Sequence, residues 1–208
     1  MQMGLHFEVQ SRWNLRQYKA RLVAKGFTQT YGVDYSETFS PVIKLNMVRV
    51  LLSVAINKEW RLYQLDVKNA FTNSNLEEVY LCPPLGFEAQ FDYEVCKLRK
   101  SLYCLKQSFK AWLDRFTLFV KPQGFSQGHS NHTLFTKRSE SGKIVVLIVY
   151  VDDIVLSGDD TVKITRLKKK MGNEFEIKDL GNLKYFLGME VARLRKGISI
   201  SQRKLLTC

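Results

Sequence analysis

The sequence has few of the residues that cross-link a chain or break its secondary structure. Its 208 residues include only 4 cysteines, none spaced as a CxxC pair, which excludes a disulfide scaffold and a zinc ribbon. The 4 prolines and 12 glycines form no linker or repeat. The longest apolar run, residues 144–151, is far shorter than the roughly 20 residues of a membrane-spanning helix, and residues 1–10 lack a secretory apolar segment. We therefore expect one continuous folded unit that is neither membrane-inserted nor secreted.

Acidic residues are also scarce relative to basic ones. Asp and Glu number 20 against 32 Lys and Arg, which gives a formal net charge of +12. Such a balance favours a polyanionic partner, either nucleic acid or an anionic membrane surface, and charge alone does not choose between them. The apolar fraction of 45% is ample for a folded core.

The spacing of apolar residues predicts a mixed α and β structure. Apolar residues recur at helical spacing in three segments, 45–57, 107–120 and a basic segment at 161–171. Alternating or continuously apolar strands are expected at 18–25, 60–67, 78–81, 94–98, 144–150, 154–156, 183–193 and 197–201. Residues 1–16 look irregular. The order strand, helix, strand, strand, helix, strand matches a split βαβ, ferredoxin-like arrangement.

Three aspartates follow apolar strands. Asp152 and Asp153 lie between two hydrophobic segments, and an isolated Asp-Asp pair is more often a simple polar turn. Asp66 ends another apolar strand, so three carboxylates would converge if these strands are neighbours. Hard Mg²⁺ ions about 4 Å apart require such oxygen ligands, and phosphoryl transfer is the chemistry that they support. Four basic residues would then bind triphosphate or template, although each of them taken alone is better explained as part of a solvated face: Lys19, Arg21, Lys106 and Lys110.

Short motifs make the sequence similar to one enzyme family. YVDD at 150–153 together with QLDVKNAF at 64–71 resembles the catalytic signature of reverse transcriptases. Four further segments, at 18–44, 101–112, 147–160 and 175–193, look like the polymerase of copia-type LTR retrotransposons. The resemblance runs from residue 18 to residue 205 in the family's order.

The resemblance implies an α+β fold, the fingers and palm of a right-hand polymerase. The palm would be a ferredoxin-like split βαβ sheet with helices on one face, formed mainly by residues 61–67 and 143–193. The reverse transcriptase domain would occupy 18–205 after an irregular lead-in at 1–17. On this resemblance the thumb, RNase H, integrase and protease regions of the Pol polyprotein would be absent, and we expect the chain to be a truncated copy.

The implied activity is RNA-directed DNA polymerisation by two-metal phosphoryl transfer. The implied partners are an RNA or DNA template with a primer and deoxynucleoside triphosphates, and no membrane is involved. The implied cofactor is a pair of Mg²⁺ ions, with Mn²⁺ as an alternative. By resemblance the protein works in a cytoplasmic particle, with the nucleus as the alternative location. The oligomeric state stays open.

The resemblance also assigns the site residues. Asp66, Asp152 and Asp153 would be catalytic and would hold the metals together with the Val67 backbone. The nucleotide would contact Lys19, Arg21, Lys68, Asn69, Ala70, Phe71 (the steric gate), Gln107, Tyr150 and Val151. The primer grip would be Phe186, Leu187, Gly188, Met189 and Glu190. The lysine that protonates pyrophosphate is either Lys178 or Lys184.

The chain departs from the family pattern beside the nucleotide pocket. Relatives usually read SLYGLKQAPRAW, whereas this chain has Cys104 for the glycine and Ser108-Phe109 for alanine-proline. A glycine there permits positive φ, so a side chain would strain the turn by on the order of 1 kcal/mol. The alternative function is therefore an impaired retrotransposon relic that folds and binds nucleic acid without efficient polymerisation. A separate RNA-binding module ranks last, because most aromatic residues are at core spacing.

Overall fold

The computed structural model describes residues 3–12, 15–36, 45–83, 86, 95–194 and 197–201. For residues 3–12, 15–22, Leu45, Asn73, Glu77 and Glu78 it describes the backbone alone. The chain forms two compact units, one made of 1–40 and 70–115 and the other of 41–69 and 116–208. Within the described residues, no helix has the length and apolar character needed to cross a membrane.

The first unit contains two antiparallel hairpins. β1 (Met3–Arg12) pairs with β2 (Leu15–Ala24), and β4 (Asn75–Leu81) pairs with β5 (Cys96–Lys100). The expectation of an irregular lead-in is therefore wrong for residues 3–12, where apolar Leu5, Phe7 and Val9 alternate with polar residues as in any half-buried strand. The second unit holds the sheet on which the candidate carboxylates lie.

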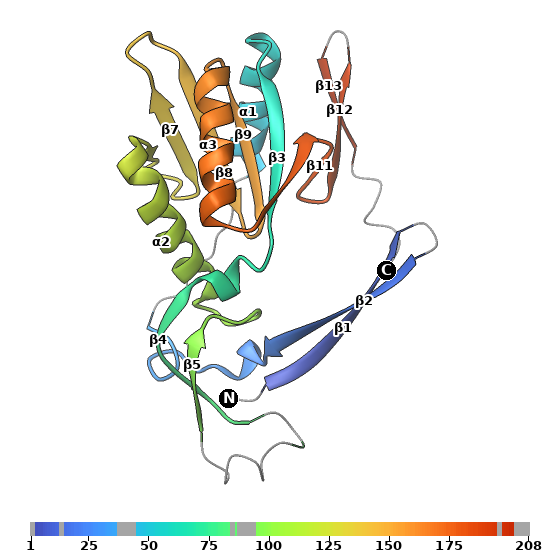
Figure 1. The fold of residues 1–208 in the computed structure, drawn as a ribbon, viewed down its shortest axis with the longest axis vertical. Helices are drawn as coiled ribbons and strands as arrows, with labels where there is room; N and C mark the ends of the chain where they lie inside the picture. Colours follow the sequence, from blue (N-terminus) through green and yellow to red (C-terminus); the bar gives the residue numbers. More distant parts are fainter. Residues whose placement is uncertain are drawn as a thin grey trace. The chain divides into compact units, whose positions relative to one another are not determined.

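This sheet has six strands in the order β10-β3-β9-β8-β7-β6 (Figure 1). The strands are β3 (Arg61–Val67), β6 (Ser126–Gln127), β7 (Leu134–Arg138), β8 (Ile144–Tyr150), β9 (Asp153–Gly158) and β10 (Ile177–Asn182). All neighbouring pairs are antiparallel, so β3 runs parallel to β8 with β9 between them. In the same way, β9 runs parallel to β10 with β3 between them. Two parallel pairs, each split by one intervening strand, make this the split βαβ arrangement.

The strand that closes this sheet differs from the one expected. The sequence pattern assigned the closing strands to residues 183–193 and 197–201, whereas β10 occupies the place beside β3. The later segments form a separate sheet of β11 (Tyr185–Phe186), β12 (Met189–Leu194) and β13 (Gly197–Ser201). β10 was missed because its residues are almost all exposed and polar, so they carry little hydrophobic signal.

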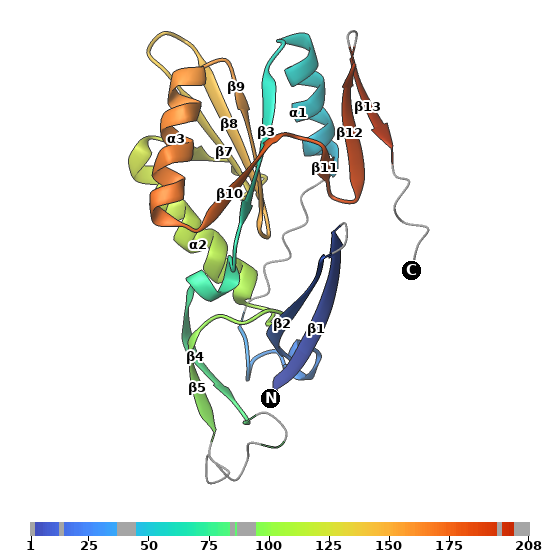
Figure 2. The same cartoon turned by 45° about the vertical axis from the view of Figure 1, so that its right-hand side comes forward.

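Helices cover both faces of the six-stranded sheet, which corrects the expectation of helices on one face (Figure 2). α1 (Leu45–Asn57) packs its buried Val48, Leu51, Leu52 and Ala55 against Leu62, Ile148 and Val155. α3 (Thr161–Glu174) lies on the other face, where the Lys168 ammonium sits 3.7 Å from the ring centroid of Tyr63. Leu62 and Tyr63 are consecutive in β3 and point to opposite faces, because side chains alternate along a strand.

Aromatic rings fill the space between the sheet and the helices of the α3 face. α2 (Ser108–Val120) contributes Phe116, which is fully buried. Its ring centroid lies 5.7 Å from that of Phe135 in β7 and 6.0 Å from that of Phe175, which follows α3. Such ring pairs add to the stabilisation from buried area, so this cluster helps to hold α3 on the sheet.

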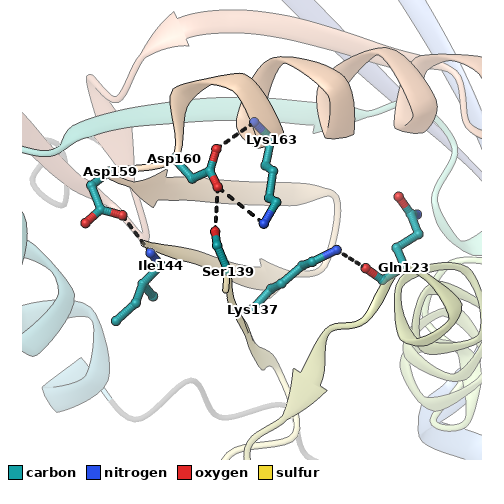
Figure 3. A network of polar contacts seen from close by, with 7 residues as sticks. All are labelled: Gln123, Lys137, Ser139, Ile144, Asp159, Asp160 and Lys163. Atoms are coloured by element: carbon teal, nitrogen blue, oxygen red, sulfur yellow. Dashed lines mark hydrogen bonds and ion pairs between the residues drawn. The ribbon is translucent and has the colours of Figure 1, made fainter. Parts of the chain in front are cut away.

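A polar network fixes the start of α3 (Figure 3). The Asp160 carboxylate caps the helix by accepting from the Lys163 amide at 3.0 Å, and it also accepts from the Ser139 hydroxyl at 2.6 Å. These two hydrogen bonds hold the pKa of the Asp160 carboxyl below its ordinary value. Next to it, Asp159 accepts from the Ile144 amide at 2.6 Å. The end of β9 and the start of α3 are therefore tied to the β7–β8 hairpin.

Replacing Asp160 with Ala is expected to lower the free energy of unfolding by about 1 kcal/mol, the usual cost of losing a helix cap. Because the folded-state pKa is depressed, the stabilisation is present above the unfolded pKa of about 3.9 and is lost as pH falls through the lower value. Urea unfolding at pH 7 and pH 3 measures both effects. Asp160→Asn keeps a capping oxygen and serves as the control, so an equal loss in both variants would contradict this assignment.

Candidate active site

Four side chains form a row across the sheet near the ends of their strands. Lys178 of β10 is paired with Asp66 of β3, Asp66 with Asp153 of β9, and Asp153 with Tyr150 of β8. Residues directly opposite each other point to the same face, with Cβ atoms about 4.5–5.5 Å apart. The sequence expectation that Asp66 and Asp153 lie side by side is therefore correct at the level of strand register.

Asp152 lies next to this row in the tight β8–β9 turn. Tyr150 pairs with Asp153, so the loop consists of Val151 and Asp152 alone. The Asp152 carbonyl accepts from the Val67 amide at 2.7 Å, which ties the turn to the end of β3. Val151 has a φ of +52°, a left-handed conformation that is strained for a β-branched residue. The tie to β3 and the strand pairing on both sides of the turn hold Val151 in this conformation.

Asp153 is half-buried, and its surroundings disfavour the ionised carboxylate. Burial raises the pKa of the Asp153 carboxyl, the hydrogen bond from Gln64 lowers it in part, and the nearby Asp152 and Asp66 charges raise it further. The Gln64 amide donates to Asp153 at 3.0 Å and is itself buried within β3. Gln64 is a residue that the sequence analysis left without a role, and only the strand register reveals it.

The donor chemistry of this row suits a hard divalent cation. Carboxylate oxygens of Asp66, Asp152 and Asp153 are the ligands that Mg²⁺ prefers, and the unfavourable burial of Asp153 is what a bound cation would relieve. Within the part of the chain that the structure describes, no three His, Cys, Asp or Glu side chains converge closely enough to hold a metal ion. The residue types fit a metal, whereas convergence of all three side chains is not observed.

Several expected nucleotide contacts lie next to the row along the chain. The Lys68 ammonium is 2.5 Å from a Glu176 carboxylate oxygen, and this contact raises the pKa of Lys68. Asn69 has a φ of +53°, as Asn tolerates in tight turns. Of the two lysines considered for pyrophosphate protonation, Lys178 is the cross-strand neighbour of Asp66, whereas Lys184 follows β10 and is exposed.

The expected primer grip forms the β11–β12 hairpin. Phe186 pairs with Met189, and the two loop residues Leu187 and Gly188 both have positive φ, as in the turns favoured by hairpins. Phe186 and Met189 are buried in the same hydrophobic cluster as the apolar face of α1. The Phe186 ring centroid lies 6.2 Å from that of Tyr150. Packing thus connects this hairpin to the Tyr150 end of the row. Glu190, the last expected primer-grip residue, is exposed.

The expected nucleotide pocket residue Gln107 belongs to the first unit, where polar contacts hold it. The Gln29 amide donates to Gln107 at 2.8 Å, and the Gln29 side-chain oxygen accepts from the Lys106 amide at 2.9 Å. Gln29 is only 5% exposed, and the Lys106 ammonium donates to the Tyr35 hydroxyl at 3.0 Å. Sequence reasoning missed Gln29, since a single glutamine in a loop carries no pattern.

The structure explains why glycine is usual at the position of Cys104. Cys104 has a φ of +69°, which favours glycine, and its side chain is exposed. On the other side, Gly26 lies so close that a Cβ there would be 1.8 Å from the Cys104 carbonyl oxygen. The strain expected from the sequence is therefore present, and the backbone has no room to relax toward Gly26.

The remaining expected contacts are also in the first unit. Ala70 is fully buried, and Phe71 is buried with its ring centroid 4.9 Å from that of Tyr103, an arrangement that ordinary core packing also explains. Lys19 and Arg21 lie on β2 opposite Glu8 and His6, and their side chains are outside the described part of the structure. Lys110 lies on α2 and is half-buried.

Comparison with known proteins identifies the family. Residues 6–207 match the family described as Reverse transcriptase (RNA-dependent DNA polymerase). The chain belongs to the reverse transcriptase family. The match begins upstream of residue 18, so β1 belongs to the family domain rather than to a lead-in.

Individual relatives agree with this assignment. The reverse transcriptase chain is 44% identical over 195 residues to the Retrovirus-related Pol polyprotein from transposon RE2 of Arabidopsis thaliana, covering 92% of the chain and 13% of the relative. Identity is 43% over 196 residues to the corresponding RE1 polyprotein of the same plant, covering 93% and 13%. It is 41% over 196 residues to that from transposon TNT 1-94 of Nicotiana tabacum, covering 92% and 15%. The copia-type resemblance is confirmed, and the chain spans a small part of these polyproteins.

Asp153→Asn is expected to stabilise the reverse transcriptase chain at neutral pH. A carboxyl whose pKa is raised on folding costs stability once it ionises, so the cost is absent below about pH 3.9 and complete above the raised value. The difference in melting temperature between the variant and the parent should therefore grow from pH 3.5 to pH 7. A difference that stays constant or shrinks would contradict the desolvation of Asp153.

Cys104→Gly is expected to be more stable than Cys104→Ala by about 1 kcal/mol, because only glycine relieves the positive φ. The alanine variant is the matched control, since it removes the thiol and keeps Cβ. Urea unfolding of the two variants gives the difference. Equal stability, or a more stable alanine variant, would show that position 104 is not strained.

Proposed function

We propose that this chain is an RNA-directed DNA polymerase domain that adds deoxynucleotides to a primer 3′-OH on an RNA or DNA template. The observation that supports this most strongly is the direct pairing of Asp66 with Asp153, with Asp152 in the adjoining turn, in a member of the reverse transcriptase family. In this proposal the second unit is the palm of a right-hand polymerase and the first unit contributes the fingers.

The residues that would hold Mg²⁺, or Mn²⁺ in its place, are Asp66, Asp152, Asp153 and the Val67 carbonyl. When bound, the two ions would activate the primer hydroxyl and stabilise charge on the transferring phosphoryl group and the leaving oxygen. Gln64 restrains the Asp153 carboxylate, and the Val67 amide holds the backbone of Asp152. These two contacts would limit the reorganisation needed for the carboxylates to converge.

The strand register favours one candidate for the proton donor, and the family resemblance supplies the candidate nucleotide contacts. Lys178, which neighbours Asp66 across the strands, is the better placed of the two candidate lysines to protonate pyrophosphate. We assign the triphosphate to Lys19, Arg21 and the backbone of 68–70, and the ribose to Phe71. Gln29 would position Gln107 beneath the new base pair through its hydrogen bond. The β11–β12 hairpin would hold the primer end.

One observation favours the second candidate, an impaired relic that folds and binds nucleic acid. The strained Cys104 lies three residues before Gln107, so strain in this loop would disturb nucleotide positioning without removing the carboxylates. Template binding would persist through the basic surface, whereas polymerisation would be slow.

Primer extension on an RNA template with Mg²⁺ and deoxynucleotides tests the proposal. The parent should extend the primer, and Asp152→Asn should lose activity by at least about a hundredfold because a metal ligand is removed. Asp159→Asn is the matched control: this carboxylate is also next to the sheet but is bonded to the Ile144 amide, so the variant should remain active.

The outcomes separate the two candidates. Extension that is equal in the parent and in Asp152→Asn would overturn the proposed site. A silent parent that recovers in Cys104→Gly would locate the defect at the strained turn, and silence in both with retained template binding would favour the relic.

A further inference from the structure

The α3 face of the second unit carries a basic pocket that the proposed polymerase site does not use. It holds about 120 Å³ and is lined by four cations, Lys137 of β7 and Lys163, Arg166 and Lys170 of α3. Gln123 and the buried Phe125 and Leu167 complete its wall, and among the residues that the structure describes no acidic side chain lines it. We call these seven residues the α3 basic pocket.

Local contacts hold two of the four cations in place. The Lys137 ammonium donates to the Gln123 carbonyl (Figure 3). It also sits 5.8 Å from the ring centroid of Phe125. The Lys163 ammonium is 3.4 Å from Asp160, whose carboxylate also accepts from Ser139 and the Lys163 amide. Asp160 therefore offsets the charge of Lys163 only in part. The apolar wall lowers the local dielectric, which strengthens attraction between the cations and an anion.

The spacing of the cations indicates an extended anion. Lys163, Arg166 and Lys170 are spaced by three and four residues, so they share one face of α3 over about 10 Å of helix. One phosphate group can enter the pocket, and the exposed Arg166 and Lys170 extend the positive charge along α3 toward the neighbouring phosphates of the same strand. The volume of about 120 Å³ fits one phosphate group, and the buried Phe125 offers no open ring for base stacking, so the pocket suits the backbone rather than the bases.

We propose that the α3 basic pocket binds the phosphodiester backbone of a single nucleic-acid strand, with little sequence preference. The pocket lies on the sheet face that carries α3, whereas Asp66 and Asp153 point to the face that carries α1. A strand held there is not the segment being copied. The contact would add affinity for long templates through a second attachment point on the same strand.

The test compares two charge reversals on one helix. Arg166→Glu changes the pocket, and Lys169→Glu makes a similar change at an exposed residue of α3 that does not line it. The probe is a fluorescently labelled oligouridine strand, and its anisotropy gives affinity at several salt concentrations. Arg166→Glu should weaken binding and make the slope of log affinity against log salt shallower by about 0.7, the value for one lost phosphate contact. Lys169→Glu should keep the parent's slope.

Lysine acetylation with and without the oligouridine strand locates the contact. Lys137, Lys163 and Lys170 should be protected by the strand while Lys169 stays reactive, and Asp152→Asn should show the same protection because the pocket does not depend on polymerase chemistry. Equal effects of the two charge reversals, absence of protection, or equally tight binding of polyglutamate would overturn the proposal. Thermal melting of both variants confirms that each is folded.

Discussion

The antiparallel pairing of β3 with β9 is the constraint on which the rest of the structure depends. It places Asp66 directly opposite Asp153. At the next residue, the Val67 amide donates a hydrogen bond to the Asp152 carbonyl. A slip of one residue would turn one of the two aspartates to the opposite face of the sheet and separate them. The fold therefore uses buried strand register to hold together carboxylates that repel one another.

That arrangement has an energetic cost that the surrounding residues offset. Asp153 is buried enough for its pKa to rise, and Gln64 supplies a hydrogen bond that favours the ionised form. Val151 keeps a left-handed conformation that the strand pairing maintains. Strain and desolvation at one end of a well-packed sheet are expected where a site is built to bind charge.

Sequence periodicity predicted the helices and strands that have a regular pattern of apolar residues. It failed for a polar strand and for the placement of helices on the sheet, which depend on tertiary contacts. The bounds of α1 were predicted because its buried face repeats regularly, and the strand nature of β8 because all its residues are apolar. β10 was missed because it is a polar strand that is held by its pairing with β3. All helices were expected on one face of the sheet, whereas α1 and α3 lie on opposite faces. A pattern of apolar residues shows that a helix packs on a sheet without showing on which side.

The same distinction holds for the site. Motifs singled out Asp66, Asp152 and Asp153 as candidates, whereas Gln64 and Gln29 became apparent only through three-dimensional contacts. The basic character of α3 was also visible in the sequence, but its lysines differ in role. Lys168 pairs with Asp179 and covers Tyr63, while Lys163 and Lys170 line the α3 basic pocket.

The central claim is that the ends of β3 and of the β8–β9 turn form one divalent-cation site. Paramagnetic broadening of backbone amide signals during a Mn²⁺ titration tests it most directly, because broadening reports distance from the ion whether or not the protein is catalytically active. The account predicts broadening centred on residues 66–67 and 151–153 that Asp66→Asn abolishes. Broadening centred instead on Asp159 and Asp160, or broadening unchanged by Asp66→Asn, would contradict it.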